Sequence, residues 1–128
     1  TGCNIYSQNG STVIADSDIK TWLDQTYYPK LKESLTASNS TLDSLNVTLP
    51  SMEQLSKVDS ITFNQSQVTF KSSFLTTTSY WTQTPSTLNS SYVWTVVGEY
   101  NNSYVQYANE STKSGVRPVI TTSKLNIK

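Results

Sequence analysis

The spacing of apolar side chains changes once along the chain, near residue 60, and this change limits the possible folds more than any other feature. Before that point apolar residues recur at helical spacing, whereas after it they alternate in short segments rich in aromatic and β-branched residues. Separate helical and β regions favour an α+β fold, with two helices packed on a twisted antiparallel sheet. The chain shows no internal repeat and no linker, so we expect residues 1–128 to form a single domain.

The first predicted helix begins near residue 17. Asp16 or Ser17 can cap its N-terminus, and Asp18 suits the positive end of the helix dipole. Five apolar residues then share one face of the helix: Ile19, Trp22, Leu23, Tyr27 and Leu31. Pro29 disfavours a helical backbone at Tyr28, so the helix is expected to end or kink there.

A second, shorter helix is predicted over residues 50–58. Ser51 can cap it, and Gln54 stands three residues later, as in a capping box. Residues 37–50, between the two helices, are expected to be an irregular connector. At the start of the chain, residues 4–14 predict two short strands joined by a turn at an Asn-Gly pair.

The second half of the chain predicts an antiparallel meander. Its alternating segments cover residues 60–64, 67–73, 79–84, 91–100, 101–111 and 115–122. The strand within 91–100 carries large apolar side chains on both faces, so it should be central and covered on both sides. The strand within 115–122 is expected to close the sheet, which would place the strands of the two chain ends near each other.

The charge and composition of the chain argue against several classes of function. Eight lysines and one arginine balance nine acidic residues, and no basic cluster is present, so neither a nucleic acid nor an anionic membrane is an expected partner. The chain has no histidine and a single cysteine, Cys3, which leaves no ligand set for zinc, haem or an iron–sulfur cluster. We therefore expect no metal, no cofactor and no enzymatic activity.

The polar composition indicates an exported protein. Serine, threonine and asparagine make up more than a third of the chain and replace most of the charge of a cytosolic surface. A low-GC genome that favours asparagine, lysine and tyrosine codons is the alternative explanation. Thr1-Gly2-Cys3 fits either the end of a lipoprotein signal or an internal piece of a longer protein, and we favour the second.

Arg117, the only arginine, lies in a predicted strand directly before Pro118. A buried guanidinium needs partners, and the candidates are loop carbonyls or the carboxylates of Asp59, Glu99 and Glu110. We favour a structural clamp over the alternative, a site for a ligand anion. Because Pro118 donates no backbone hydrogen bond, the strand should lie at an edge or a bulge.

The three tryptophans are interpreted as structural residues. Trp22 lies on the apolar face of the first helix, and Trp81 and Trp94 lie in predicted strands. Each is expected to pack in the core rather than to contact a ligand.

Residues 99–111 are the strongest candidate for a contact surface. Tyrosines there alternate with asparagine, serine and glutamine, a composition typical of binding loops. The predicted ligand-binding residues are Tyr100, Asn102, Tyr104, Tyr107 and Asn109. Residues 85–91 could form an adjacent rim. The alternative is a solvent-exposed hairpin without a ligand.

Four segments resemble, in the same order, motifs of a bacterial domain family of unknown function. They are DSDIKTWLDQTYYPKL at 16–31, LPSMEQLSKV at 49–58, SYWTQTP at 79–85 and SGVRPVITT at 114–122. This family is related to the C-type-lectin-like fold of formylglycine-generating enzymes and of the variable proteins of diversity-generating retroelements. Gln83 stands where the family often has an arginine, so no role of that arginine is carried over.

The resemblance implies a C-type-lectin-like module for display or recognition at the end of a pilin-like or surface-anchored protein. In the related receptor-binding proteins, the region just before the closing strand contacts ligands, which here corresponds to residues 99–111. The resemblance does not imply the enzymatic or calcium-dependent sugar-binding activity of the related proteins. The C-terminal half lacks the cysteines needed to generate formylglycine, and the loop and strand motifs of calcium-dependent sugar binding are absent.

Together these features predict a non-catalytic recognition or adhesion module on a bacterial cell surface, with a surface glycan or protein as its partner. Two alternatives stay open. One is a minor-pilin-like assembly subunit that contacts other pilus subunits, and the other is a receptor-binding protein of a phage or a retroelement.

Overall fold

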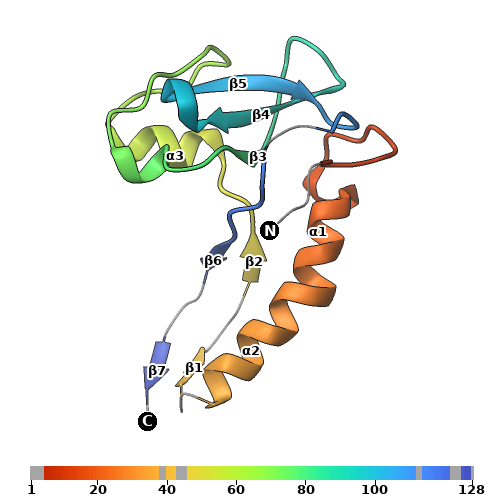
Figure 1. The fold of residues 1–128 in the computed structure, drawn as a ribbon, viewed down its shortest axis with the longest axis vertical. Helices are drawn as coiled ribbons and strands as arrows, with labels where there is room; N and C mark the ends of the chain where they lie inside the picture. The colour runs from red at the N-terminus through yellow and green to blue at the C-terminus, as the bar shows by residue number, and fades with distance from the viewer. Residues whose placement is uncertain (1–4, 38–39, 43–45, 112–113, 122–124, 128) are drawn as a thin grey trace.

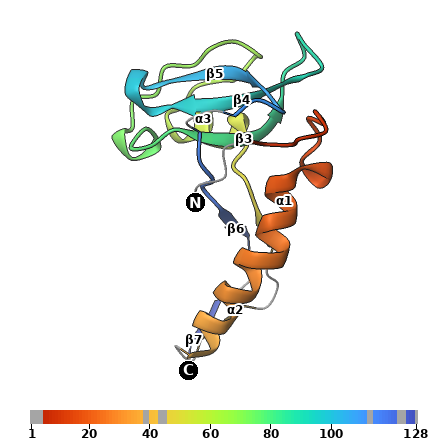
Figure 2. The ribbon, with the colours of Figure 1, turned by 45° about the vertical axis from the view of Figure 1, so that its right-hand side comes forward.

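The chain forms a head and a narrow stalk that projects from it (Figures 1 and 2). The computed structural model describes residues 5–37, 40–42, 46–111, 114–121 and 125–127. The head contains a sheet of β3 (Tyr80–Pro85), β4 (Tyr92–Val97) and β5 (Asn102–Tyr107), together with the helix α3 (Met52–Val58). Helices and antiparallel sheets occur together, so the α+β prediction is confirmed.

The stalk is made of the helix α2 (Tyr28–Ala37) and the strand pair β1 (Ser40–Leu42) and β7 (Leu125–Ile127). The helix α1 (Asp18–Trp22) and the pair β2 (Asn46–Thr48) and β6 (Val119–Thr121) join it to the head (Figure 1). Both strand pairs are antiparallel, and each joins a segment from the first half of the chain to one from its end. The expectation of an irregular connector over 37–50 is therefore wrong where the structure describes it.

The first helix does not end at Pro29. A π-helical turn, Leu23–Tyr27, links α1 to α2, and Tyr28 N–H donates to the Leu23 carbonyl. A wider turn directly before a proline accommodates its ring and its missing N–H, because the local hydrogen bonds no longer follow the α-helical pattern. α1 and α2 thus form one continuous helical column (Figure 1).

The start and the buried face of this helix agree with the sequence pattern. Ser17 is the N-cap, and its hydroxyl accepts a hydrogen bond from Lys20 N–H at 3.0 Å. Ile19 and Leu23 are fully buried. The other apolar residues of the face are partly buried against the same cluster, whereas α2 has no buried residue at all.

The predicted capping box of α3 is also present. The Ser51 hydroxyl accepts from Gln54 N–H at 3.1 Å, and the Gln54 side chain accepts from Ser51 N–H at 2.9 Å. The helix buries Met52 and Leu55 against the sheet. Two orphan N–H groups are thereby satisfied at the point where the chain enters the head.

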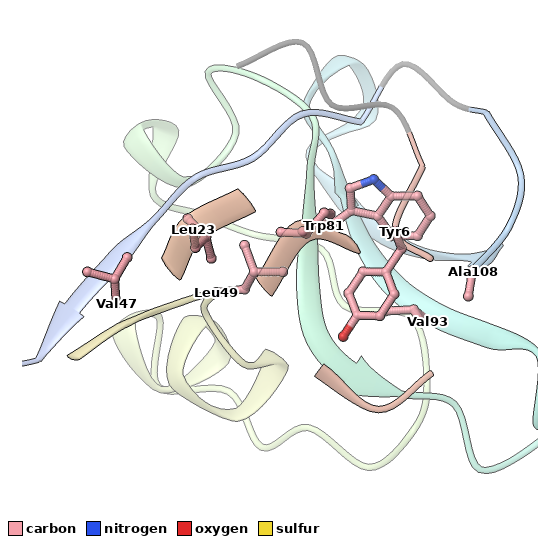
Figure 3. Close-up of a cluster of buried hydrophobic side chains, with 8 residues drawn as sticks. Tyr6, Leu23, Val47, Leu49, Trp81, Val93 and Ala108 are labelled. Carbon is pink, nitrogen blue, oxygen red and sulfur yellow. The ribbon is translucent and has the colours of Figure 1, made fainter. Parts of the chain in front are cut away.

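β4 is the central strand of the head sheet, as predicted, and its four interior residues are buried. Two core clusters lie on its opposite faces. The first core cluster contains Tyr6, Ile19, Leu23, Val47, Leu49, Trp81, Val93 and Ala108 (Figure 3). The second core cluster contains Met52, Leu55, Val68, Phe70, Leu75, Tyr80, Trp94 and Val96. The alternation of Val93 and Trp94 between the clusters shows that both faces of the strand are covered.

Four predicted strands are absent from the described residues. Residues 60–64 and 67–73 form no strand, although Thr69 makes an isolated bridge with Asn102, and Val68 and Phe70 make backbone hydrogen bonds with Ser103 and Asn101. Left-handed backbone at Ser60 and Gln65 interrupts the extended conformation there. Residues 5–13 hold the predicted turn, in which Gly10 has a φ of 83°, but they form no strand: the Tyr6 carbonyl accepts from the first N–H groups of α1, and Ser7 N–H donates to the Ala108 carbonyl.

The segment 115–122 does not close the head sheet. Gly115 forms one isolated parallel bridge with Tyr80, and the chain then leaves the sheet so that β6 pairs with β2. Further along β3, Gln83 N–H donates to the Pro50 carbonyl at 2.9 Å, so this edge of the strand is occupied by the segment before α3. The first and last strands of the structure, β1 and β7, do pair, but the strands expected at residues 4–14 do not form in the part that the structure describes.

Candidate functional site

A shallow groove of about 300 Å³ lies over one face of β5. Its lining consists of Gln67, Val97, Tyr100, Asn102, Tyr104 and Gln106. Asn102, Tyr104 and Gln106 alternate along β5 and therefore share one face of the strand. Tyr100 comes from the 3₁₀ turn Gly98–Tyr100 that precedes the strand, and Gln67 comes from the segment running beside it.

The sharp turn between β4 and β5 brings Tyr100 to the groove. Asn101 closes the 3₁₀ turn in the left-handed region, with a φ of 56°, a conformation that asparagine adopts more readily than most residues. Gly98 permits a close approach, because a Cβ there would lie 2.8 Å from the Thr76 carbonyl oxygen. The backbone of this turn thus fixes Tyr100 beside the strand that carries Tyr104.

Tyr100 and Tyr104 are the exposed rings of the groove, with 66% and 54% of their surface accessible. Asn102 is half-buried. Its Oδ1 is closed off from solvent and has no hydrogen-bond partner among the described residues. The groove therefore combines exposed aromatic surface with a buried acceptor, and no charged side chain belongs to its lining.

Tyr107 and Asn109 lie elsewhere. Tyr107 points to the opposite face of β5, where its ring meets that of Tyr92 edge-on at a centroid distance of 4.5 Å. The hydrogen bond with Tyr107 is the main cause that raises the pKa of Tyr92. Asn109 follows the strand, is exposed, and faces the turn at Gly10. Of the five predicted ligand-binding residues, the structure thus brings together Tyr100, Asn102 and Tyr104.

Arg117 is half-buried behind the sheet. Its Nη1 donates to the Phe74 carbonyl oxygen at 2.9 Å, and its guanidinium lies over the Tyr80 ring, 5.1 Å from the centroid. Burial raises the pKa of Tyr80, and the nearby cation of Arg117 partly offsets this effect. The protonated Tyr80 hydroxyl donates to the Leu75 carbonyl at 2.7 Å. The arginine and the tyrosine together hold the turn Ser73–Leu75 through its carbonyl groups.

The carboxylates considered as partners of Arg117 make no ion pair with it. Asp59 instead accepts hydrogen bonds from Lys71 N–H at 2.7 Å and from the backbone and hydroxyl of Ser72. Among the described residues, the ion pair present is that of Lys20 and Asp24 on the helix.

The tryptophans occupy three different environments. Trp81 is fully buried in the first core cluster, and its ring lies 5.4 Å from that of Tyr6. Trp94 is buried in the second cluster and donates from Nε1 to the Gln65 side chain at 2.8 Å. Trp22 is half-buried beside Tyr27. Gln83 donates from Nε2 to the Leu49 carbonyl at 2.6 Å and so ties β3 to the segment before α3.

The described residues contain no group of three or more histidine, cysteine, aspartate or glutamate side chains arranged to hold a metal. No helix in the described part of the chain is long and apolar enough to cross a bilayer. Cys3 falls outside the described residues. A comparison of the chain with family models, curated proteins and solved structures gave no match.

Sequence reasoning missed three residues of the groove lining. Gln106 could have been found, because the two-residue period that joins Asn102 to Tyr104 continues to it. Val97 and Gln67 carry no such signal. Gln67 lies far from β5 in the sequence, and the backbone bonds of Val68 and Phe70 to Ser103 and Asn101 bring it to the groove.

Proposed function

We propose that this chain is a non-catalytic recognition or adhesion module with a C-type-lectin-like fold, displayed on the outside of a bacterial cell. The groove over β5 is its contact surface. The observation that carries this proposal is the pair of exposed rings, Tyr100 and Tyr104, set beside the carboxamides of Asn102 and Gln106. Tyrosine gives a large contact area at a low cost in conformational entropy, and carboxamides both donate and accept hydrogen bonds.

The backbone beneath the groove is held from both sides. β5 pairs along its whole length with β4, the buried central strand. On its other edge, Val68 accepts from Ser103 N–H and Phe70 N–H donates to Asn101, just before the strand, while the Ser103 hydroxyl accepts from Val68 N–H at 2.8 Å. A surface fixed in this way loses little freedom on binding, which favours affinity.

The proposal is tested by the binding of the fluorescently labelled chain to a panel of bacterial and epithelial cells. The double variant Tyr100→Ser and Tyr104→Ser should bind at least about tenfold more weakly, because hot-spot contacts concentrate on exposed aromatic anchors. Tyr107→Ser is the matched control, since this residue is similarly exposed but lies on the opposite face. Equal binding by the double variant and the wild-type chain would rule out the groove.

The stalk favours a second candidate function, assembly with other subunits. No residue of α2 is buried, and a hollow of about 570 Å³ follows its side formed by Pro29, Lys32, Glu33, Thr36 and Ala37. A projecting helix with so little internal contact is a surface on which a neighbouring subunit can pack. Cross-linking from a cysteine placed at Thr36 would capture such a neighbour in intact pili, and the same cysteine at Thr87 in the head would not.

A further inference from the structure

We infer that the groove takes an uncharged glycan end, held by ring packing against Tyr100 and Tyr104 and by hydrogen bonds to the three carboxamides. This inference rests on the proposed recognition function and names its ligand class. The groove lies at the small end of the roughly 300–1,000 Å³ range of ligand pockets, so it fits the terminal part of an oligosaccharide rather than a long chain.

The charge of the lining selects against an ionised ligand. None of the six lining side chains bears a charge, and Arg117 is engaged by Phe74 and Tyr80 elsewhere in the head. An anionic sugar would lose part of its hydration in the groove without gaining a cation. Glu99, the exposed neighbour of Tyr100, adds like charge close to the rim. Hydroxyl groups carry no such cost.

The chemistry of the lining matches the two kinds of surface that a sugar ring offers. A pyranose has faces of C–H groups and a rim of hydroxyls. The phenol rings of Tyr100 and Tyr104 can cover an apolar face, while Gln67, Asn102 and Gln106 can each donate and accept at the rim. Sugar hydroxyls both donate and accept hydrogen bonds, and carboxamides supply an acceptor and two donors without a charge.

Asn102 adds a further reason to expect a hydroxyl donor. Its Oδ1 is buried and lacks a partner among the described residues, and an unsatisfied buried acceptor is unfavourable. Tyr104 and Gln106 flank it on the same face of β5 and are not themselves buried. A ligand packed against these side chains can donate a hydroxyl hydrogen to this oxygen once they shift apart, so the free energy of the unsatisfied acceptor is recovered only on binding.

An extended peptide fits a different part of β5. Ser103 N–H bonds outward to Val68, so by alternation the backbone of Val105 points outward while that of Tyr104 faces β4. Val105 has no backbone hydrogen-bond partner outside the sheet among the described residues, and an added strand would pair there. The groove itself offers side chains and no free backbone ladder, which favours a glycan over a peptide at this site.

The experiment measures retention of the full chain on arrays of immobilised neutral oligosaccharides, of acidic oligosaccharides and of peptides. We expect retention on neutral oligosaccharides that falls at least about tenfold in Tyr104→Ala and Asn102→Val and stays unchanged in Tyr107→Ala. Asn102→Val should not lower the thermal midpoint, because it removes the unsatisfied acceptor. A midpoint that stays constant while retention falls separates loss of binding from loss of folding.

Three results would overturn the glycan inference. Retention on acidic oligosaccharides alone would contradict the inference that the ligand is neutral. If Tyr104→Ala lowered that retention, the groove would still be the binding site. Retention on peptides that is abolished by Val105→Pro and not by Tyr104→Ala would place binding at the strand edge instead. Absence of retention on every neutral oligosaccharide would also overturn the inference, and the cell-binding comparison of groove and control variants would still decide the recognition function separately.

Discussion

The head and the stalk differ in how many of their side chains are buried. In the head, the central strand of the sheet is buried on both faces between two core clusters. In the stalk, α2 runs for ten residues without a buried side chain, and β6 at its upper end also contains none. Since burial of apolar surface is the dominant favourable term in folding, most of the stability must reside in the head.

The difference explains why the candidate site lies where it does. A recognition surface needs a fixed backbone, and β5 obtains it from the buried strand beside it. The stalk offers reach and accessible surface, which suit contacts with other subunits. Elements with few buried contacts open locally at a lower free energy than the core does.

The largest effect is expected for Trp81→Ala in the first core cluster. Trp81 is fully buried against Tyr6, so its truncation should lower the free energy of unfolding by about 3–5 kcal/mol. Leu31→Ala, at the half-buried start of α2, is the comparison and should cost only about 1 kcal/mol. Urea denaturation of both variants measures the difference, and equal losses would contradict the concentration of stability in the head.

A smaller loss is expected for Arg117→Met, which keeps the length of the side chain and removes its charge. The variant loses the bond to the Phe74 carbonyl and the contact with the Tyr80 ring, together worth about 1–2 kcal/mol. This is less than a fully buried ion pair would give, because Arg117 is half-buried and has a neutral partner. A loss below about 0.5 kcal/mol would show that the clamp is not structural.

The sequence predicted the elements whose signals are local. The face of Ile19 and Leu23, the capping box of Ser51 and Gln54, and the burial of β4 all follow from spacing that a single segment carries. The pairing of β1 with β7 and of β2 with β6 joins segments more than seventy residues apart. Their strands are three residues long, too short to show alternation, so only tertiary contacts define them.

The candidate site was predicted in part for the same reason. Composition alone marked the tyrosines of residues 99–111 without separating the faces of β5. The two-residue period would have placed Tyr107 opposite Tyr104, as the structure does. The contribution of Gln67 depends on how residues 67–70 bond to the sheet edge, which no local pattern encodes.

The stalk variant Ser34→Pro should have a still smaller effect on the head. Ser34 is exposed in the middle of α2, and a proline inside a helix costs about 3 kcal/mol where the helix folds together with the rest of the protein. If the stalk opens independently, the free energy of unfolding followed by near-UV circular dichroism should change by less than about 0.5 kcal/mol, while the far-UV helical signal falls. Ser34→Ala is the control. A full loss seen by both signals would show that head and stalk unfold as one unit.

The smallest effect concerns acid and should be confined to the head. Asp59, at the end of α3, accepts hydrogen bonds from Ser72 and from Lys71 N–H, and these bonds lower its pKa, the Ser72 hydroxyl contributing most. Because the folded-state pKa is lowered, the stabilisation is complete above the ordinary aspartate pKa of about 3.9 and disappears as pH falls through the folded value. The carboxylate lies at the surface, so solvent screens the effect.

Asp59→Asn should therefore lower stability at neutral pH and flatten the dependence of the urea midpoint on pH below about 4, because the titrating group is gone. Asp24→Asn is the matched control: its carboxylate pairs with Lys20 on α1, far from the turn that Asp59 holds. If the acid transition of Asp59→Asn follows that of the wild-type chain, the contact between α3 and residues 71–72 does not contribute to the stability of the head. If the pH dependence seen by near-UV circular dichroism flattens while the helical signal of α2 is unchanged, the acid effect is confined to the head. The result would complement Ser34→Pro, which perturbs the stalk alone.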